Sequence, residues 1–402
     1  MLKNIEINNF KTIDRLKLEL GRTNVFIGEN GAGKSNILEA IALAAAANSR
    51  KLDNEFLFPR GIRITSASLM RPQFDDESQN SPILIKATNH NEATTEFELN
   101  HDNKEYSNWT TKTTHNGLGE EHFFGEVLTE MSADNPNMIV ELKEAINQLE
   151  AFVDAAKSGS HFKIASDSIL GKITKRTQNK LANLIPELND FAIYSPETST
   201  LRKFDSEGQI EPLGVCGEGL QKLLLVLSKD EPETLVSIIN TLSIFGWFAG
   251  LHFEHNAGTS HSSIEVEDRF FRTNSQLLDI RGANEGFLYI MFYITLFASK
   301  LCPKFFAIDN IENSLNPKLC AHLVSQIHNI SVAQNKQSIL TTHNPAILDG
   351  LNLDDDEQRL FAVQRNPDGY TRVKRIQKKK GSDLKLSEMF MRGVIGGLPK
   401  GF

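Results

Sequence analysis

The sequence predicts an α/β fold built on a mainly parallel sheet, with an antiparallel β meander and a helical insertion. From residue 263 to residue 365, strand-like and helix-like segments alternate, which is typical of a parallel sheet. Residues 81–114 contain three short runs that alternate apolar and polar side chains, which indicates a meander with one wet face. Between residues 120 and 187, apolar side chains recur at helical spacing, at Ile139, Leu142, Ile146, Leu149 and Val153.

The remaining elements follow from local patterns. Residues 3–27 predict two short strands, in which apolar and polar residues alternate, and then a buried apolar run. A glycine-rich turn comes next and opens a helix over residues 34–47. Residues 191–195 predict a strand closed by Pro196, and two apolar runs within residues 218–250 predict helices. We therefore expect four parts: an N-terminal lobe over 1–119, the helical insertion over 120–190, a connector over 191–262, and a C-terminal lobe over 263–402.

The composition excludes several classes of protein. With 40% AVILMFWYC residues in 402, the chain is an ordinary globular protein rather than a disordered or fibrous one. No stretch approaches the ~18–20 apolar residues of a membrane helix, and the N-terminus has no apolar leader, so we expect a cytoplasmic protein without a membrane partner. Three cysteines, Cys216, Cys302 and Cys320, are too few for a disulfide framework.

The charge balance argues against general coating of nucleic acid. The chain has 43 Lys+Arg against 51 Asp+Glu, a formal charge of −8, whereas such proteins are usually basic. Any nucleic-acid contact is therefore expected to be local. The best local basic cluster, which a solvated hairpin would also explain, is Arg372, Lys374, Arg375, Lys378, Lys379 and Lys380.

A phosphate-binding motif follows the first buried apolar run. Residues 28–35 read GENGAGKS and match G-x-x-x-x-G-K-[ST], between an apolar strand and an apolar helix. Glycines let backbone N–H groups surround phosphate oxygens, and the start of the helix adds a favourable dipole. We expect Lys34 to reach the β- and γ-phosphates and Ser35 to contact Mg²⁺. The predicted nucleotide-binding residues here are Asn30, Gly31, Ala32, Gly33, Lys34, Ser35 and Asn36.

Two further strands end in polar residues. The apolar segment 305–308 ends at Asp309, which we expect to complete the magnesium shell. The segment 338–342 ends at His343, whose imidazole could bond the γ-phosphate or the attacking water. A glycine-containing turn over 279–286 opens a very apolar helix. It predicts either a second anion site, for nucleotide held by another subunit, or a plain helix cap.

In order, the segments INNFKTI, GENGAGKS, RGANEGF, FFAIDNIENSLNP and TTHNP resemble the ABC-type ATPases of the SMC, RecF and OLD branch. More closely, they resemble the stand-alone AAA-type ATPases of bacterial anti-phage systems, the group that includes the ATPase subunits of Septu and PARIS. The motifs span residues 5–345. The resemblance implies a P-loop ABC-type ATPase core that binds ATP and Mg²⁺ and works as a homodimer or higher homo-oligomer.

The resemblance also implies roles for single residues. Phe10, Lys11 and Thr12 match the segment on the adenosine and phosphate side, and Asn284, Glu285 and Gly286 match the signature that acts across a dimer. Asn313, Ser314 and Leu315 match the D-loop. His343 matches the switch histidine. Gln73 is our choice for the Q-loop glutamine, a metal ligand with Ser35 and Asp309. It rests on position alone, and an exposed loop residue is the alternative.

One position departs from the family pattern. The family has a glutamate after the Walker B aspartate as general base, and Asn310 stands there in this chain. An amide cannot accept the proton, and loss of a general base typically costs ~10²–10⁴-fold in rate. Glu312, which matches another acid of the family, could substitute for it. We therefore expect slow hydrolysis with Asp309, Asn310, Glu312 and His343 at the catalytic centre.

Three other features carry weaker expectations. His252, Glu254, His255 and His261 form a loose cluster in a loop-like region with poor metal spacing. The acidic run 354–357 is expected to be solvated. The tail 389–402 is apolar and glycine-rich, which would suit docking on the core or on a partner.

Three functions are compatible with these motifs. The first is a nucleotide-dependent switch and scaffold in anti-phage defence that regulates a separately encoded effector, expected to be a nuclease because no nuclease motif occurs in this chain. The second is a RecF- or SMC-like ATPase that acts directly on DNA, which predicts salt-dependent DNA affinity. The third is a self-contained OLD-type nuclease, for which the 59 residues after His343 are too few. The negative charge and the absence of long arms favour the first.

Overall fold

The computed structural model describes residues 1–75, 77–134, 140, 142–143, 169–182, 184–204, 210–255, 262–271, 277–377 and 384–398. Its central sheet has six strands in the order β15-β14-β3-β13-β12-β8, and all neighbours pair parallel except β14 and β15. This confirms the mainly parallel sheet. The strands are β3 (Thr23–Ile27), β8 (Ile193–Tyr194), β12 (Phe305–Ile308), β13 (Gln337–Thr342), β14 (Gln358–Arg365) and β15 (Thr371–Ile376).

The predicted meander belongs to a larger antiparallel sheet in the order β2-β1-β4-β5-β6-β7. Its strands are β1 (Leu2–Phe10), β2 (Ile13–Glu19), β4 (Ile83–Asn89), β5 (Thr94–Asn100), β6 (Thr110–His115) and β7 (Leu118–Gly119). Residues 3–27 thus divide between two sheets. The reason is visible in burial, since β2 alternates buried and exposed residues whereas every residue of β3 is buried.

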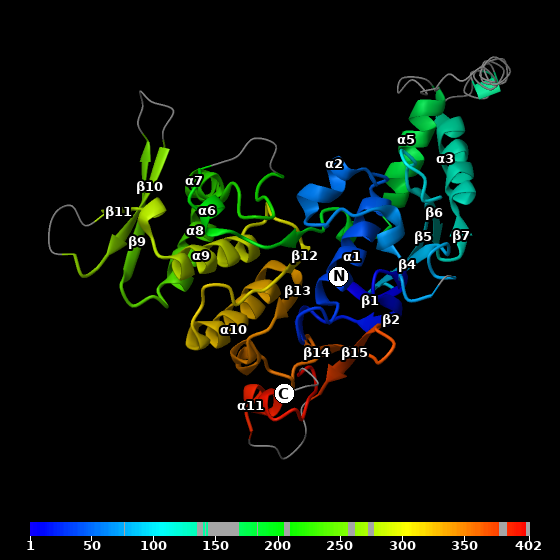
Figure 1. Ribbon diagram of the computed structural model, residues 1–402. Helices are drawn as coiled ribbons and strands as arrows, with labels where there is room; N and C mark the ends of the chain where they lie inside the picture. The colour runs from blue at the N-terminus through cyan, green and yellow to red at the C-terminus, as the bar shows by residue number, and fades with distance from the viewer. Residues whose placement is uncertain are drawn as a thin grey trace.

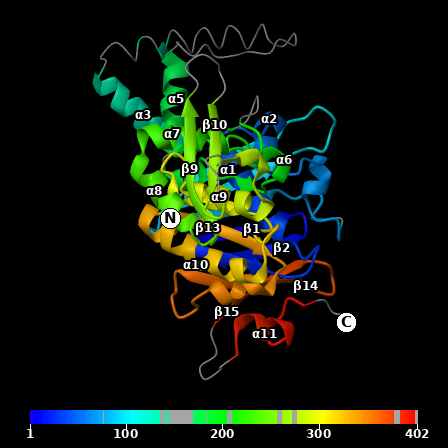
Figure 2. The ribbon, with the colours of Figure 1, turned by 90° about the vertical axis from the view of Figure 1, so that its left-hand side faces the viewer.

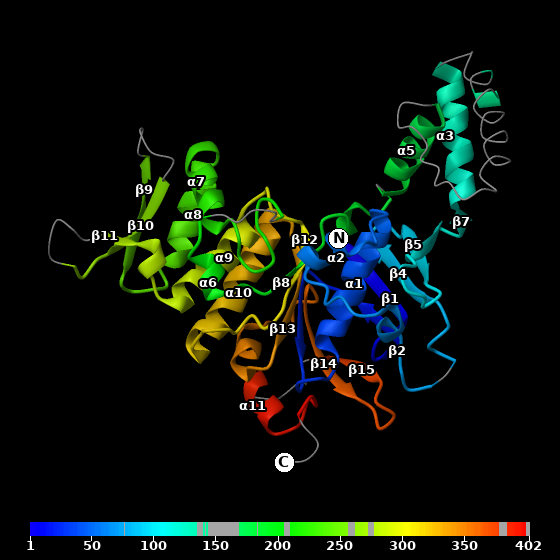
Figure 3. The same ribbon diagram turned by 45° about the horizontal axis from the view of Figure 1, so that its top comes forward.

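Helix α1 (Lys34–Asn48) lies between the two sheets (Figure 3). Thirteen of its fifteen residues are buried, and the small alanine side chains let both sheets approach it. Side chains of β12 alternate between two cores. Phe305 and Ala307 pack on the α1 side, and Phe306 and Ile308 pack on the opposite side.

Helices cover the other face of the central sheet (Figure 1). They are α6 (Thr198–Leu201), α7 (Leu220–Asp230), α8 (Pro232–Leu242), α9 (Glu285–Ala298) and α10 (Pro317–Gln334). Twelve residues of α9 are buried, so this helix runs through the core. The helices predicted within 218–250 are present, but they end at Leu242 and a strand begins at Phe248.

A separate antiparallel sheet contains β9 (Phe248–His255), β10 (Ser262–Asp268) and β11 (Leu277–Asp279). It lies beside α8, away from α1 (Figures 1 and 3). The first strand of the series expected over 263–365 therefore belongs to this sheet and not to the parallel one. The pairing of β9 with β10 also joins residues on both sides of the expected 262/263 boundary.

The helical insertion contains α3 (Glu120–Asp134) and α5 (Ile169–Ala182), which lie side by side (Figure 1). Lys180 Nζ contacts Glu126 Oε2 at 2.6 Å and Glu130 Oε1 at 2.9 Å. Leu142 packs near this pair of helices. The other four residues of the predicted apolar spacing, Ile139, Ile146, Leu149 and Val153, lie outside the described residues.

The remaining helices are short. They are α2 (Asn54–Leu57), α11 (Leu386–Met391) and 3-10 turns at Phe58–Arg60, Ala67–Met70, Pro186–Leu188, Ile280–Gly282 and Pro345–Gly350. The sequence predicts that the tail docks on the core or on a partner. Its described part docks on the core, because Met389, Phe390 and Ile395 are buried there. Figure 2 shows α11 beneath β14 and β15. Within the described ranges, no helix has both the length and the apolar character to cross a membrane.

Candidate functional site

Three neighbouring strands bring the predicted catalytic residues to one edge of the sheet. The strands β3, β13 and β12 are adjacent and parallel, so their carboxyl ends lie together. The phosphate loop follows β3, His343 follows β13 and Asp309 follows β12. In parallel α/β sheets, this edge is where ligands bind.

The phosphate loop has the backbone that its glycines predict. Gly31 and Gly33 adopt positive φ angles of 77° and 104°, which side chains other than glycine rarely tolerate. Among the described residues, no side chain caps α1, and no acid lies in its first turn, so its N–H groups are open to an anion. Two residues beyond the motif brace the loop. Thr371 Oγ1 donates to Ala32 O at 3.0 Å, and Arg365 Nε donates to Gly31 O at 2.8 Å.

Lys34 is buried at the centre of this loop, with 5% of its surface exposed. Its Nζ donates to Gly28 O at 2.9 Å and to Glu29 O at 3.1 Å. Burial lowers the pKa of Lys34 to about 8, against the opposing charges of Asp309, Glu312 and Glu29. The ammonium group is therefore mostly charged at pH 7 and titrates slightly above it.

His343 faces the same ammonium group, with its Nδ1 3.4 Å from Lys34 Nζ. An ammonium group can only donate, so Nδ1 accepts and the neutral ring carries its proton on Nε2. Burial and the positive charge of Lys34 lower the pKa of His343. The imidazole is therefore neutral at pH 7 and offers an N–H donor from Nε2.

Ser35 and Asp309, two of the three residues predicted to hold magnesium, are in direct contact. Ser35 Oγ donates to Asp309 Oδ2 at 3.0 Å. The other carboxylate oxygen accepts from the hydroxyl of Thr341, which in turn accepts from Asn310 N at 2.9 Å. A hydroxyl and a carboxylate suit Mg²⁺, which usually takes few protein ligands and completes its shell with water and phosphate. The residues present therefore fit the ion.

Glu312 is in direct contact with His343. Its Oε1 accepts from the backbone N–H of His343 at 2.7 Å. Its Oε2 is buried without a hydrogen-bond partner among the described residues. Asn310, by contrast, has a left-handed backbone with φ of 55°. The structure thus places a carboxylate, two residues after the expected position of the general base, beside the predicted switch histidine.

A hollow of about 350 Å³ collects several residues predicted for the adenosine and metal side. Lys11, Thr12, Asn36 and Gln73 all line it. Asn36 Nδ2 donates to Thr12 Oγ1 at 2.7 Å, and Lys11 pairs with the buried Glu39. Gln73 Nε2 donates to Ser68 O at 2.7 Å, a carbonyl of its own loop. Phe10 does not face this hollow, because its side chain is fully buried in the core around α1.

The turn at 284–286 serves within one chain as a helix cap. Asn284 Oδ1 accepts from Phe287 N at 2.9 Å and thereby caps α9. Ser314 Oγ donates to Glu285 Oε2 at 3.1 Å, and a Cβ at Gly286 would lie 3.0 Å from Ser314 O. This turn therefore packs on the segment 313–315 of its own chain, and its action across a dimer stays a prediction.

The acidic run lies at the surface, as expected. Asp354 and Asp356 are exposed, and Asp355 and Glu357 are partly exposed. Asp355 pairs with His328 at 3.2 Å, Asp356 pairs with Arg359 at 2.8 Å, and Glu357 lies 3.3 Å from Arg22. These contacts connect the turn before β14 to α10, to β14 itself and to the segment before β3.

Two of the three described residues of the basic cluster have acidic partners. Arg375 pairs with Asp356, and Arg372 lies 3.8 Å from Asp14. Residues 378–380 lie outside the described residues.

The histidine cluster lies on a hairpin instead of a loop. His252 Nε2 is 2.8 Å from Glu267 Oε2 on the paired strand, and Glu254 and His255 belong to β9. His261 lies outside the described residues. Within those ranges, no group of three or more His, Cys, Asp or Glu side chains could hold a metal ion.

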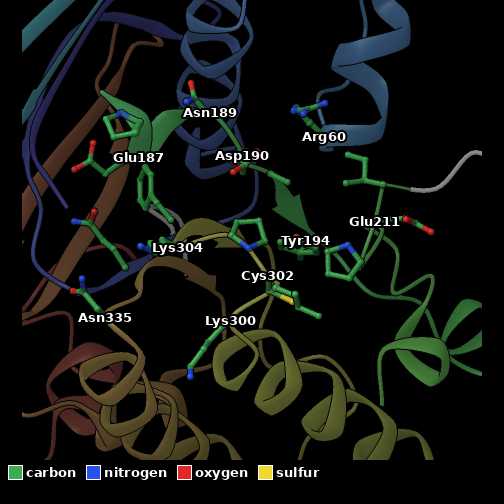
Figure 4. A pocket seen from close by; sticks show the side chains of 18 of the residues that line it. Arg60, Glu187, Asn189, Asp190, Tyr194, Glu211, Lys300, Cys302, Lys304 and Asn335 are labelled. Atoms are coloured by element: carbon green, nitrogen blue, oxygen red, sulfur yellow. The ribbon is translucent and has the colours of Figure 1, made fainter. Parts of the chain in front are cut away.

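Another cavity lies elsewhere, with a volume of about 600 Å³ (Figure 4). It borders Phe305 and Gln337, the first residues of β12 and β13, and thus the edge opposite to the phosphate loop. Basic and acidic side chains, among them Arg60, Lys304 and Glu187, line it together. None of the site residues predicted from the sequence is among the residues that line it.

Comparison with known proteins agrees with this geometry. Residues 4–222, more than half of the chain, match the family described as an AAA domain. Residues 248–349 match a second AAA domain family, whose description also names the AbiEii toxin and a type IV TA system. A segment of 55 residues is 42% identical to the DNA replication and repair protein RecF of Listeria welshimeri and of Lactococcus lactis. It covers 13% of this chain and only 15% of each RecF chain.

Among solved structures, the chain resembles the Smc head bound to the C-terminal winged-helix domain of ScpA. The TM-score is 0.53 at 13% identity, over 94% of this chain and 98% of the other. At this identity the likeness is one of fold, and it confirms the predicted α/β architecture of the ATPase core.

Proposed function

The chain belongs to the AAA domain family of ATPases, and we propose that it is an ATP-dependent switch that binds ATP with Mg²⁺ and hydrolyses it slowly. One observation carries the nucleotide site. Ser35 and Asp309 come from segments 274 residues apart in sequence, yet their oxygens lie 3.0 Å apart at the start of α1. A phosphate site with Mg²⁺ uses that pairing beside a free helix N-terminus and a buried lysine.

Each residue has a separate task in this proposal. The N–H groups of the phosphate loop and Lys34 bind the β- and γ-phosphates, and the Nε2–H of His343 orients the γ-phosphate. Ser35 and Asp309 would hold Mg²⁺, which neutralises phosphate charge when bound. Thr341 fixes the Asp309 carboxylate by donating to its second oxygen.

Slow hydrolysis follows from the residues near the γ-phosphate. Asn310 can orient a water molecule but cannot take its proton. Glu312 is the substitute base that we propose, because His343 N holds one of its oxygens and leaves the other unpaired. Its place two residues from the usual base makes the water less well aligned, so we expect slow turnover.

We further propose that two subunits pair around the nucleotide. The γ-phosphate would lie between the phosphate loop of one subunit and residues 284–286 of the other, in an isologous dimer with two composite sites. The N–H groups at the start of α9 would supply the second set of donors. The position of this turn against residues 313–315 links it to the loop that carries Asp309.

The paired state is proposed to hold and regulate a separately encoded effector, expected to be a nuclease, in anti-phage defence. The second matched family supports this reading, because its description names the AbiEii toxin and a type IV TA system. Co-purification of this chain with the product of a neighbouring gene in the presence of ATP would identify the effector. Loss of phage resistance in the Lys34→Ala variant would connect the defence function to the nucleotide site.

The alternative is a RecF- or SMC-like ATPase that acts directly on DNA, which the RecF similarity favours. It predicts tight DNA binding that weakens steeply with salt. The ion pairs of Arg372 and Arg375 reduce the free basic surface and weigh against it. Fluorescence anisotropy with duplex DNA at 50 and 200 mM salt, with and without ATP, separates the two functions.

Titration calorimetry with ATP and Mg²⁺ tests the nucleotide site. We expect wild-type binding with Lys34→Ala below detection, because the phosphates lose their buried cation. Lys104→Ala is the matched control, since Lys104 is a mostly exposed lysine on the loop between β5 and β6. Equal affinity of Lys34→Ala and Lys104→Ala would contradict the assignment.

A further inference from the structure

The helix α9 faces the loop that carries the catalytic acids. At its start, Glu285 Oε2 accepts from Ser314 Oγ at 3.1 Å, and Gly286 lies so close that a Cβ would be 3.0 Å from Ser314 O. Tyr293 lies seven residues after Gly286. Because seven residues make almost two helical turns, Tyr293 lies on the same face of α9 as Gly286.

Tyr293 has an unusual environment for a tyrosine. Its side chain is fully buried, and its hydroxyl has no hydrogen-bond partner among the described residues. Buried tyrosine hydroxyls normally find a partner, because an unpaired polar group loses its contacts with water and gains nothing in return. A phenylalanine would fill the same space without this cost.

An unpaired acceptor lies on the loop against which the start of α9 packs. Glu312 Oε2 is buried and without a hydrogen-bond partner among the described residues, while Oε1 is held by His343 N. Burial, Tyr289 and the charge of Glu312 together raise the pKa of Tyr293 well above its usual value. The charge of the carboxylate therefore reaches the phenol, and the phenol keeps its proton and can donate.

We propose that Tyr293 is a positioning residue whose hydroxyl donates to Glu312 Oε2 in the nucleotide-bound, paired state. The inference rests on the proposed function. When the turn at 284–286 contacts the nucleotide of the other subunit, a shift of α9 against the loop 309–316 joins the two unpaired atoms. Glu312 is then held at both oxygens, by His343 N and by Tyr293, and each oxygen keeps a lone pair for the attacking water. Hydrolysis is thereby coupled to pairing.

Tyr293→Phe tests the proposal, because it removes one hydroxyl and keeps the ring. We expect single-turnover hydrolysis of bound ATP to fall about tenfold or more, as for loss of a hydrogen bond to a charged group. The ATP dissociation constant should not change, since Tyr293 is not expected to contact the nucleotide. The melting temperature of the nucleotide-free variant should equal or exceed that of wild type, because an unpaired buried hydroxyl has been removed.

Tyr289→Phe is the matched control, since Tyr289 is a tyrosine on the same helix with its ring centroid 6.2 Å from that of Tyr293. It should hydrolyse ATP at the wild-type rate. The double variant Tyr293→Phe/Glu312→Gln should be no slower than Glu312→Gln alone, because the hydroxyl acts only through that carboxylate.

Several results would overturn the inference. Equal rates of ATP hydrolysis for Tyr293→Phe and its control Tyr289→Phe would refute the coupling. A rate loss accompanied by a lower melting temperature would show that the hydroxyl serves folding instead. If the wild-type protein does not hydrolyse ATP, or if Lys34→Ala hydrolyses it equally fast, the proposed function itself fails. The inference then fails with it. That outcome is recognised before any tyrosine variant is measured.

Discussion

The affinity for ATP is expected to fall as the pH rises through about 8. Lys34 supplies the cation of the phosphate loop, and its burial lowers its pKa to about 8 in the nucleotide-free protein. Bound phosphates bring negative charge to the ammonium group and raise that pKa again. ATP therefore binds the protonated form, and deprotonation of the free protein competes with binding.

The size of the effect follows from the pKa. With a pKa of about 8, the lysine is about 90% protonated at pH 7 and about 10% protonated at pH 9. The affinity should thus be about tenfold weaker at pH 9 than at pH 7, and binding near pH 8 should take up about half a proton. His343 adds no titration in this range, because its pKa is lowered from 6.5.

Titration calorimetry in two buffers with different ionisation enthalpies measures both quantities between pH 7 and pH 9. Lys34→Arg is the control, because an arginine stays charged throughout this range and should bind ATP with an affinity independent of pH. A wild-type affinity that stays constant between pH 7 and pH 9 without proton uptake would refute the role of Lys34 as a buried, titrating phosphate ligand.

Two substitutions test the supports of the site. Thr371→Val removes the buried hydroxyl that donates to Ala32 O. We expect urea unfolding to show a free energy of unfolding lower by about 1–3 kcal/mol, and we expect ATP binding to weaken. An unchanged unfolding curve would contradict the role of Thr371 in bracing the loop. Asn310→Glu should speed hydrolysis by ~10²–10⁴-fold if it restores a general base. Because residue 310 has φ of 55°, the same change should lower the free energy of unfolding by about 1–2 kcal/mol. A folded variant without faster turnover would leave Glu312 as the base.

The part of the site that sequence predicts is the part built from parallel strands. A strand that ends in Asp309, another that ends in His343 and a glycine-rich loop must meet at one sheet edge, and they do. This reasoning needs only strand direction and a motif of local sequence. It therefore reaches Lys34 and Ser35 as well.

Long-range supports have no such local signal. Thr371 and Arg365 lie more than 300 residues after the loop that they brace, and nothing near them in sequence marks their partners. The threonine at 341 is also an ordinary strand residue, and only its place beside Asp309 gives it a task. Phe10 matched a motif, but its alternating strand turned the ring into the core.

The pairing of strands is the second feature that the sequence does not predict. The pattern of residues 248–268 gives no indication that β9 and β10 form a hairpin away from the parallel sheet, because short apolar runs suit a helix or a strand equally. The sequence does separate β1 and β2, which alternate apolar and polar residues, from the apolar run of β3. It does not show that β1 and β2 join β4 in a second sheet, because the pairing of β1 with β4 joins segments far apart in sequence.

The central claim is that each nucleotide is shared between the phosphate loop of one subunit and residues 284–286 of the other. Mixing two inactive variants, Lys34→Ala and Gly286→Arg, tests it most directly. Gly286→Ala is the control for the added Cβ, which would lie 3.0 Å from Ser314 O. In a mixed dimer, one composite site has an intact loop and an intact turn. We predict that the mixture hydrolyses ATP although neither variant does so alone. If Gly286→Ala is active but the mixture is as inactive as its components, the account is contradicted.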